Sequence, residues 1–273
     1  MASLNGENGE RDRRSLRILV AEDNPVNQLV VRRLLEREGH AVVVAGTGME
    51  AVDLADKEAF DLVLMDVQMP EMSGFDATRL IRQRERSLGR RTPIIAVTAH
   101  VMKGYRERCF EAGMDGYVTK PIDLAALFRA IESALGPKDG PSVPDAPAGP
   151  SPVAIDRKAL LDRVDNDRDL LSELIRLFRE DCPKLVSGIS DAIARGDAPG
   201  VDRGAHTLKG SVGNFCAYAA FEAARELEML GKSGQIESCN EALAILKAEL
   251  AKVDAELREI SGGEGPAQPE EKR

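Results

Sequence analysis

The chain has 273 residues, of which 43% are hydrophobic and 30% are charged, and this fits a soluble globular protein with one or two domains. Its formal net charge of −9 argues against DNA or another nucleic acid held by bulk electrostatics. No apolar stretch reaches the length of a membrane span, so we expect no membrane insertion.

The N-terminus and the cysteines bear on the compartment. Residues 1–14 are polar, lack the apolar core of a signal peptide and are predicted to be a disordered tail. The cysteines lie far apart and form no Cys-x-x-Cys pair, which fits reduced thiols. We therefore predict a cytoplasmic protein without disulfides or a structural zinc site.

Residues 15–135 contain five short apolar runs, each followed by an amphipathic segment. The runs are 18–21, 41–45, 62–65, 94–97 and 117–118. Asn24 and Pro25 predict the start of the first helix, and Gly39 predicts its end. Further helices are expected at about 49–58, from Ser73 through Arg84, near 102–112, and from Asp123 to Leu135.

This alternation is typical of a parallel sheet with helices on both faces. Because crossover connections are right-handed, the carboxyl ends of all strands share one edge, where ligands of such folds bind. The residues at these strand ends should therefore meet in one pocket: Glu22, Asp23, Asp66, Thr98 and Lys120.

Residues 136–153 are rich in Pro, Gly, Ser and Ala and predict a flexible linker with a reach of up to roughly 55 Å. No strand pattern follows it. Amphipathic helices are expected at 155–164, 170–194 (with Pro183 as a possible bend), 199–215, 218–230 and 236–260. Gly231 to Gly234 should form a turn. These helices predict an antiparallel bundle over 154–260, with a disordered tail at 261–273.

Asp66 ends the apolar run Leu62–Met65 and precedes a loop with Pro70 and Gly74. From this stretch alone, a helix cap or turn residue competes evenly with a functional carboxylate. Neighbouring carboxylates at strand ends can bind Mg²⁺, which favours phosphoryl chemistry. No Gly-x-x-x-x-Gly-Lys-Ser/Thr loop is present, which leaves the alternative that an aspartate itself is phosphorylated.

Four segments of the first half, in this order and spacing, make it resemble a response-regulator receiver domain: LVAEDN, LVLMDVQMP, AVTAH and DGYVTKP. The resemblance implies a flavodoxin-like five-stranded sheet with strand order 2-1-3-4-5. It implies that Asp66 is the phosphoryl acceptor, with Thr98 bonded to the phosphoryl group and Lys120 paired with it.

The same resemblance implies a Mg²⁺ site formed by Glu22, Asp23, Asp66 and the backbone carbonyl of Gln68. Glu22 could instead be an acid that orients the ligands without contacting the ion, or simply a solvated acid. Tyr117 matches the aromatic residue that switches conformation on phosphorylation, although plain packing would also explain it. The Lys120–Pro121 peptide bond is expected to be cis.

The helix predicted at 199–215 carries His206. Its apolar residues fall on one face at 100° per residue, and His206 lies opposite them, so we expect it to be exposed. Gly210 and Gly213 follow on the side of His206 and would bare the surface around the imidazole. Lys209 adds a positive charge nearby.

The stretch AHTLKGSVGNFCA resembles the motif of histidine-containing phosphotransfer domains, with His206 matching the phosphorylated histidine and Lys209 and Gly210 its companions. Together, the two resemblances imply a two-component phosphorelay intermediate. Asp66 would accept a phosphoryl group from a sensor histidine kinase, and His206 would carry it between receiver domains upstream and downstream. Without a recognisable nucleotide-binding region, the chain is not expected to be a kinase.

Other interpretations remain open at this point. The protein could be a phosphorylation-switched adaptor whose bundle only docks or dimerises. A hydrolase with a phosphoaspartate nucleophile is disfavoured, because no second acid stands two residues after Asp66. Transfer from Asp66 to His206 within one chain is allowed by the linker. The chain could be a native protein or an excised end of a hybrid kinase.

Overall fold

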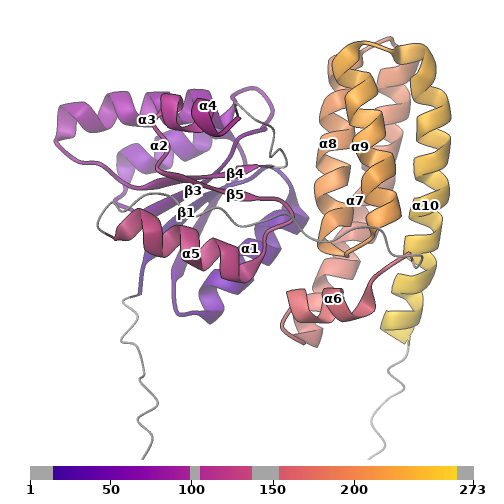
Figure 1. Ribbon diagram of the computed structural model, residues 1–273, viewed down its shortest axis with the longest axis horizontal. Helices are drawn as coiled ribbons and strands as arrows, with labels where there is room; N and C mark the ends of the chain where they lie inside the picture. Colours follow the sequence, from indigo (N-terminus) through magenta and orange to yellow (C-terminus); the bar gives the residue numbers. More distant parts are fainter. Residues whose placement is uncertain (1–14, 99–104, 137–153, 263–273) are drawn as a thin grey trace, which may run out of the picture.

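The computed structural model describes residues 15–98, 105–136 and 154–262. The two predicted tails, the predicted linker and the start of the helix expected near 102–112 lie outside these residues. Within them the chain forms an α/β unit followed by a unit of helices (Figure 1).

The α/β unit is built on a five-stranded parallel sheet whose order is β2-β1-β3-β4-β5. The strands are β1 (Arg17–Ala21), β2 (Ala41–Ala45), β3 (Leu62–Asp66), β4 (Ile94–Thr98) and β5 (Gly116–Thr119). The register pairs Asp66 with Val97 and Thr98 with Thr119, so the carboxyl ends of the central strands lie side by side. The predicted fold class and strand order are confirmed.

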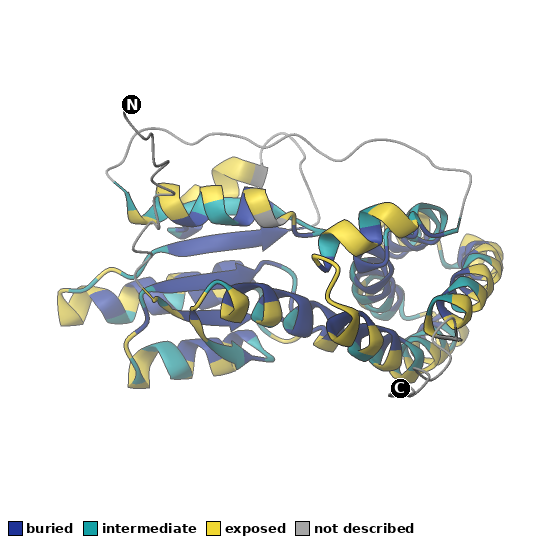
Figure 2. Ribbon diagram, turned by 90° about the horizontal axis from the view of Figure 1, so that it is seen from below, coloured by how far each residue is buried: buried dark blue, intermediate teal, exposed yellow. Residues whose placement is uncertain are grey.

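Helices cover both faces of this sheet. They are α1 (Pro25–Arg37), α2 (Gly48–Lys57), α3 (Gly74–Leu88), α4 (Tyr105–Ala112) and α5 (Leu124–Leu135). Alternate strand residues supply two apolar cores: Leu19 packs with α2, α3 and α4, whereas Ile18 packs with α1 and α5. The central strands β1, β3 and β4 are almost entirely buried, whereas the edge strands β2 and β5 are partly accessible, and the helices expose their outer sides (Figure 2).

The predicted helix starts at Asn24 and Ser73 are confirmed, and the second of these helices is longer than predicted. The side chains of Asn24 and Ser73 each accept backbone hydrogen bonds as N-caps. α3 continues beyond Arg84 to Leu88 and ends where Gly89 adopts a left-handed conformation, with φ of 64°. Glycine tolerates this conformation without the penalty that a Cβ brings, so the helix ends there.

The second unit is a helical bundle. Its helices are α6 (Arg157–Arg163), α7 (Arg168–Ala194), α8 (Ala198–Asn214), α9 (Tyr218–Ser233) and α10 (Ile236–Gly262). Pro183 lies inside α7, which continues past it. The rings of Phe178 and Phe215 pack at 4.9 Å between centroids inside the bundle. The predicted all-helical region is confirmed.

The turn expected at residues 231–234 is wrong, because α9 continues to Ser233 and turns only at Gly234. Gly231 is instead a buried contact point between helices. A Cβ at Gly231 would lie 2.6 Å from the backbone nitrogen of Asp202 in α8. The glycine lets α9 approach α8 closely.

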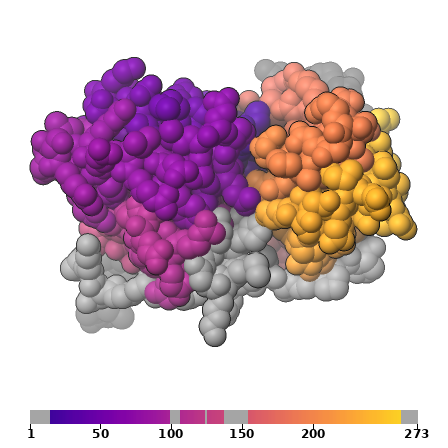
Figure 3. Space-filling model, turned by 90° about the horizontal axis from the view of Figure 1, so that it is seen from above, coloured from indigo at the N-terminus to yellow at the C-terminus, as the bar shows by residue number. Residues whose placement is uncertain are grey.

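The two units touch along one side (Figure 3), and α1 contacts α7 and α8 of the bundle. Val31 and Leu35 of α1 face the sheet. Residues on its other side are buried in the same apolar cluster as the bundle core: Val26, Leu29, Val30 and Leu34. α1 is therefore shared between both units.

Candidate functional site

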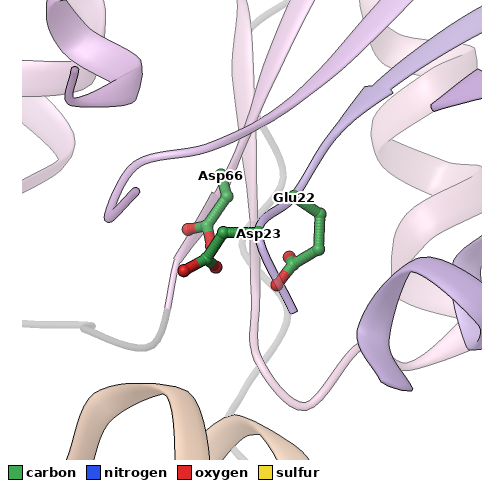
Figure 4. A group of neighbouring side chains, drawn as sticks. All are labelled: Glu22, Asp23 and Asp66. Carbon is green, nitrogen blue, oxygen red and sulfur yellow. The ribbon is translucent and has the colours of Figure 1, made fainter. Parts of the chain in front are cut away.

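Three carboxylates gather at the carboxyl edge of the sheet. Glu22 and Asp23 follow β1, and Asp66 ends the neighbouring strand β3, so the parallel register brings them together. One oxygen of each carboxylate lies within 4.8 Å of one from each of the others (Figure 4). Asp66 is 1% exposed and Glu22 is 2% exposed, so these charges lie largely out of water.

Lys120 completes this cluster from the end of β5. Its Nζ lies 2.6 Å from Glu22 Oε2 and 2.6 Å from Asp66 Oδ2. Its backbone N–H donates to the carbonyl of Thr98, the buried last residue of β4. The Lys120–Pro121 peptide bond is cis, as expected. The structure thus brings together Glu22, Asp23, Asp66 and Lys120, with Thr98 joined to Lys120 through the backbone.

Three carboxylates surround one lysine, and this excess of negative charge, together with burial, shifts the pKa values of the group. Burial raises the pKa of Asp66, and the Lys120 charge only partly opposes this effect. Burial and the neighbouring Glu22 raise the pKa of Asp23 to about 6. Burial would lower the pKa of Lys120, but Asp66 and Glu22 outweigh it and raise that pKa. The pocket therefore carries excess negative charge that a cation would neutralise.

The oxygen atoms around the acids also suit a hard cation. The Gln68 side-chain oxygen Oε1 is buried and has no hydrogen-bond partner among the described residues, and Gln68 lines a groove together with Asp23. Its backbone N–H donates to Asp66 Oδ1 over 3.1 Å and orients that carboxylate. Glu22 differs, because Asn27 donates to its Oε1 and Lys120 contacts its Oε2. Tyr117, half-buried in β5, packs against the core formed with α2, α3 and α4.

His206 lies on α8 and is only 7% exposed, so the prediction that it is exposed is wrong. Two features outside its own helix explain the difference. Glu228 of α9 lies beside the ring, with its Oε1 2.9 Å from His206 Nδ1. On the other side, the acidic edge of the α/β unit covers α8, and His206 shares a cavity with Glu22, Asp23 and Lys120.

Glu228 also contacts the two lysines next to His206. This carboxylate is 1% exposed, and its two oxygens also accept hydrogen bonds from Lys209 and, at 2.6 Å, from Lys232. Burial would raise the pKa of Glu228, but His206 and Lys209 hold it well below its usual range. The Lys209 ammonium is thus bound to Glu228. The sequence prediction included neither Glu228 nor Lys232; their only local signal is an i,i+4 acid–base pair on α9.

The imidazole of His206 is held in one orientation. Burial lowers its pKa, and the hydrogen bond to Glu228 partly opposes this shift, so the ring is neutral at pH 7. A carboxylate only accepts, so Nδ1 carries the proton and Nε2 keeps its lone pair. A neutral imidazole with a free Nε2 lone pair is a nucleophile.

The glycines after His206 lie at the contact between the units. A Cβ at Gly210 would lie 3.1 Å from Asn27 Nδ2, and a Cβ at Gly213 would lie 3.6 Å from the Cβ of Pro121. The distance at Gly213 is an ordinary van der Waals contact, so it is Gly210 whose bare backbone allows the α/β unit to approach the helix that carries His206.

Comparisons with known proteins identify both units. The family model of the response regulator receiver domain matches residues 18–132, and that of the Hpt domain matches 173–256. The response regulator DivK of Brucella ovis is 40% identical over 119 residues, which cover 44% of this chain and 95% of DivK. The sensor protein GacS of Pseudomonas syringae is 32% identical over 254 residues, which cover 90% of this chain but 28% of GacS.

Among solved structures, the receiver domain of the Pseudomonas aeruginosa sensor histidine kinase PA1611, with a magnesium ion coordinated in its active-site cleft, is 42% identical. It covers 45% of this chain and 99% of that one, with a TM-score of 0.42. The chain belongs to the response-regulator receiver family and carries an Hpt domain after its receiver domain. The chain thus combines a receiver domain with an Hpt domain, and it spans less than a third of the length of GacS.

The described part of the chain contains no helix that combines the length and the apolar content required to cross a bilayer.

Proposed function

We propose that Asp66 accepts a phosphoryl group from the phosphohistidine of a sensor kinase, and that His206 exchanges phosphoryl groups with aspartyl phosphates. One of these is the aspartyl phosphate of Asp66 in the same chain. The observation that carries this proposal is the shared cavity, lined by Glu22, Asp23 and Lys120 on one side and by His206 on the other.

The two transfers balance without a nucleotide. In the first, an Asp66 oxygen attacks the donor's phosphorus, forming a P–O bond as the donor's P–N bond breaks. In the second, His206 Nε2 attacks the same phosphorus in line, forming a P–N bond and returning the carboxylate of Asp66. The Nδ1 proton stays on the ring, where Glu228 stabilises the positive charge that develops.

Within the receiver, Lys120 pairs with Asp66 before transfer and with the phosphoryl group after it, and the Thr98 hydroxyl bonds that group. Tyr117 responds to this change as the switch residue. Lys209 contributes positive charge near His206 through its bond to Glu228. Gly210 provides the clearance.

Mg²⁺ is the proposed cofactor, held by Asp23, Asp66 and the backbone carbonyl of Gln68, with Glu22 as a further ligand. It would neutralise charge on the phosphoryl oxygens. The excess negative charge of the pocket and the close approach of the three carboxylates support this assignment. Since both Glu22 oxygens already contact Asn27 and Lys120, Glu22 also suits a supporting position behind the ion.

The proposed partners are a sensor histidine kinase and a second receiver domain. Because Asp66 and His206 are both covered in the docked arrangement, either partner must displace one unit from the other. We further propose domain boundaries at 15–135 and 154–260. The four free thiols support a cytoplasmic location.

Phosphorylation by a purified kinase tests these assignments. Asp66→Asn should lose the base-labile acyl phosphate, and His206→Gln should lose the acid-labile phosphoramidate. If both variants retain both species, the assignments are wrong.

The burial of His206 favours a second candidate, an adaptor in which the bundle only docks on the receiver. In that case a His206→Ala chain would signal normally, whereas phosphotransfer through His206 requires that signalling be lost.

A further inference from the structure

The contact between α1 and the bundle contains three kinds of interaction. The apolar side of α1 lies against the bundle core. Two ion pairs flank it, Arg33–Glu173 at 3.2 Å and Arg37–Asp165 at 2.9 Å. Buried hydrogen bonds join the N-terminal end of α1 to α8.

The first two kinds of interaction hold the units together but define their alignment poorly. Apolar contact is non-directional, so a helix can slide or rotate and remain buried. The ion pairs are solvent-exposed, with side chains 34–63% accessible, and such pairs contribute little. Neither would hold His206 at a fixed place over Asp66.

The buried hydrogen bonds are directional. Asn24 Nδ2 donates to the Thr207 carbonyl at 2.9 Å and to Ser211 Oγ at 2.8 Å. Asn214 Nδ2 donates to Asn27 Oδ1 at 2.7 Å. Their partners on α8 stand at positions 207, 211 and 214, one stripe beside His206. A shift of α1 along α8 would leave these buried groups unpaired, which is costly.

Asn27 also reaches the acidic pocket, because its Nδ2 donates to Glu22 Oε1 at 2.7 Å. Glu22 in turn contacts Lys120, and Lys120 contacts Asp66. A continuous polar chain therefore joins the phosphorylation pocket to α8, and Asn27 is the link at which it crosses between units.

We propose that Asn27 and Asn214 are a positioning pair that sets the register of His206 over Asp66, with the Asn24–Ser211 bond in support. The apolar side of α1 supplies affinity, and the asparagines supply alignment. This inference rests on the proposed transfer between Asp66 and His206 within one chain.

The test separates docking from transfer in the full chain. Asp66 is phosphorylated with acetyl phosphate, and single-turnover appearance of phosphohistidine gives the transfer rate. Small-angle X-ray scattering gives the docked fraction. Asn214→Asp keeps the side-chain size but turns an acceptor toward Asn27 Oδ1. Ser211→Ala/Asn214→Ala removes the partners without adding charge. Arg33→Ala, which breaks an exposed ion pair, is the control.

Both bundle variants should accept phosphoryl groups at Asp66 normally and remain largely docked, yet transfer to His206 at least about tenfold more slowly. The Arg33→Ala control should transfer phosphoryl groups to His206 at a rate proportional to its docked fraction. The inference is overturned if the Asn214 variants transfer at the wild-type rate, or if their transfer falls only in proportion to lost docking. A wild-type chain that docks but never phosphorylates His206 would instead contradict the proposed function.

Discussion

At the scale of single residues, the site depends on pairing buried charges that would otherwise oppose folding. Glu228 contacts His206, Lys209 and Lys232 at once and is itself almost inaccessible. It therefore has two consequences: it compensates two ammonium groups and fixes the proton of His206 on Nδ1.

Substitutions of Glu228 should separate these consequences. Glu228→Gln keeps an oxygen that can accept from Nδ1, so the tautomer should survive, but the neutral amide no longer compensates the ammonium groups and stability should fall. Glu228→Ala removes the partner of the buried Lys209 ammonium as well as the acceptor for Nδ1, and should lower the free energy of unfolding by about 3 kcal/mol or more. Denaturant unfolding and ¹⁵N spectra of the imidazole measure the two effects. An alanine variant with wild-type stability and tautomer would refute this role.

Asp23 gives a prediction about pH. Its pKa is raised to about 6, so its ionised form destabilises the folded state above that pH, and the penalty disappears as pH falls toward the unfolded value near 4. Without Mg²⁺, Asp23→Asn should raise the free energy of unfolding by about 1–2 kcal/mol at pH 8, after allowance for solvent screening, and by little at pH 4.

Thermal unfolding in a chelator across this range is the measurement for Asp23→Asn. Added Mg²⁺ should remove the advantage of the variant, because the wild-type acid then has a cation partner. Glu111→Gln, a change at an exposed carboxyl, serves as the control. If the gain in stability from Asp23→Asn grew as the pH falls, it would contradict the proposed burial of an ionised Asp23 carboxylate.

At the scale of helices, two glycines in the bundle form a matched pair. A Cβ at Gly231 would meet the backbone of Asp202, whereas one at Gly188 in α7 would meet nothing within 4 Å. Gly231→Ala should destabilise the bundle by about 1–3 kcal/mol, because it separates α8 from α9. Gly188→Ala should stabilise it by up to about 1 kcal/mol through helix propensity. Chemical denaturation measures the free energy of unfolding of both variants. Equal changes in the two would contradict the close contact of Gly231 with α8.

α1 supplies a second prediction at this scale, because its two sides serve different units. Val30→Asp places a charge in the contact with the bundle and should undock the units and slow transfer to His206, while the receiver remains folded around Val31 and Leu35. Scattering and circular dichroism measure these outcomes. Glu36→Ala, at an exposed site on the same helix, should leave docking intact. A compact Val30→Asp chain would argue against docking through α1.

The helices and strands also show what sequence reasoning can reach. Apolar runs and caps such as Asn24 predict the sheet, and a parallel sheet forces Asp66 and Lys120 to the same edge. The environment of His206 was not predictable from its own helix, because Glu228 and the α1 contact come from elsewhere in the chain. Gly231 was misread as a turn for the same reason: its role depends on α8, which its neighbours in sequence do not reveal.

At the scale of the whole molecule, the receiver and the Hpt domain form one docked arrangement in which His206 shares a cavity with Glu22, Asp23 and Lys120, and Lys120 contacts Asp66. This arrangement favours phosphoryl transfer inside one chain, because the covalent connection and the α1 contact keep the effective concentration of His206 near Asp66 high. It also implies that a kinase and a second receiver act on separated units.

The central claim is that Asp66 transfers its phosphoryl group to His206 of the same chain. Single-turnover transfer after acetyl phosphate treatment tests it across a wide range of protein concentrations, together with an equimolar mixture of Asp66→Asn and His206→Gln chains. We predict a wild-type rate independent of concentration and a mixture that is slower and concentration-dependent. Equal rates for the mixture and the wild type, both rising with concentration, would contradict the claim.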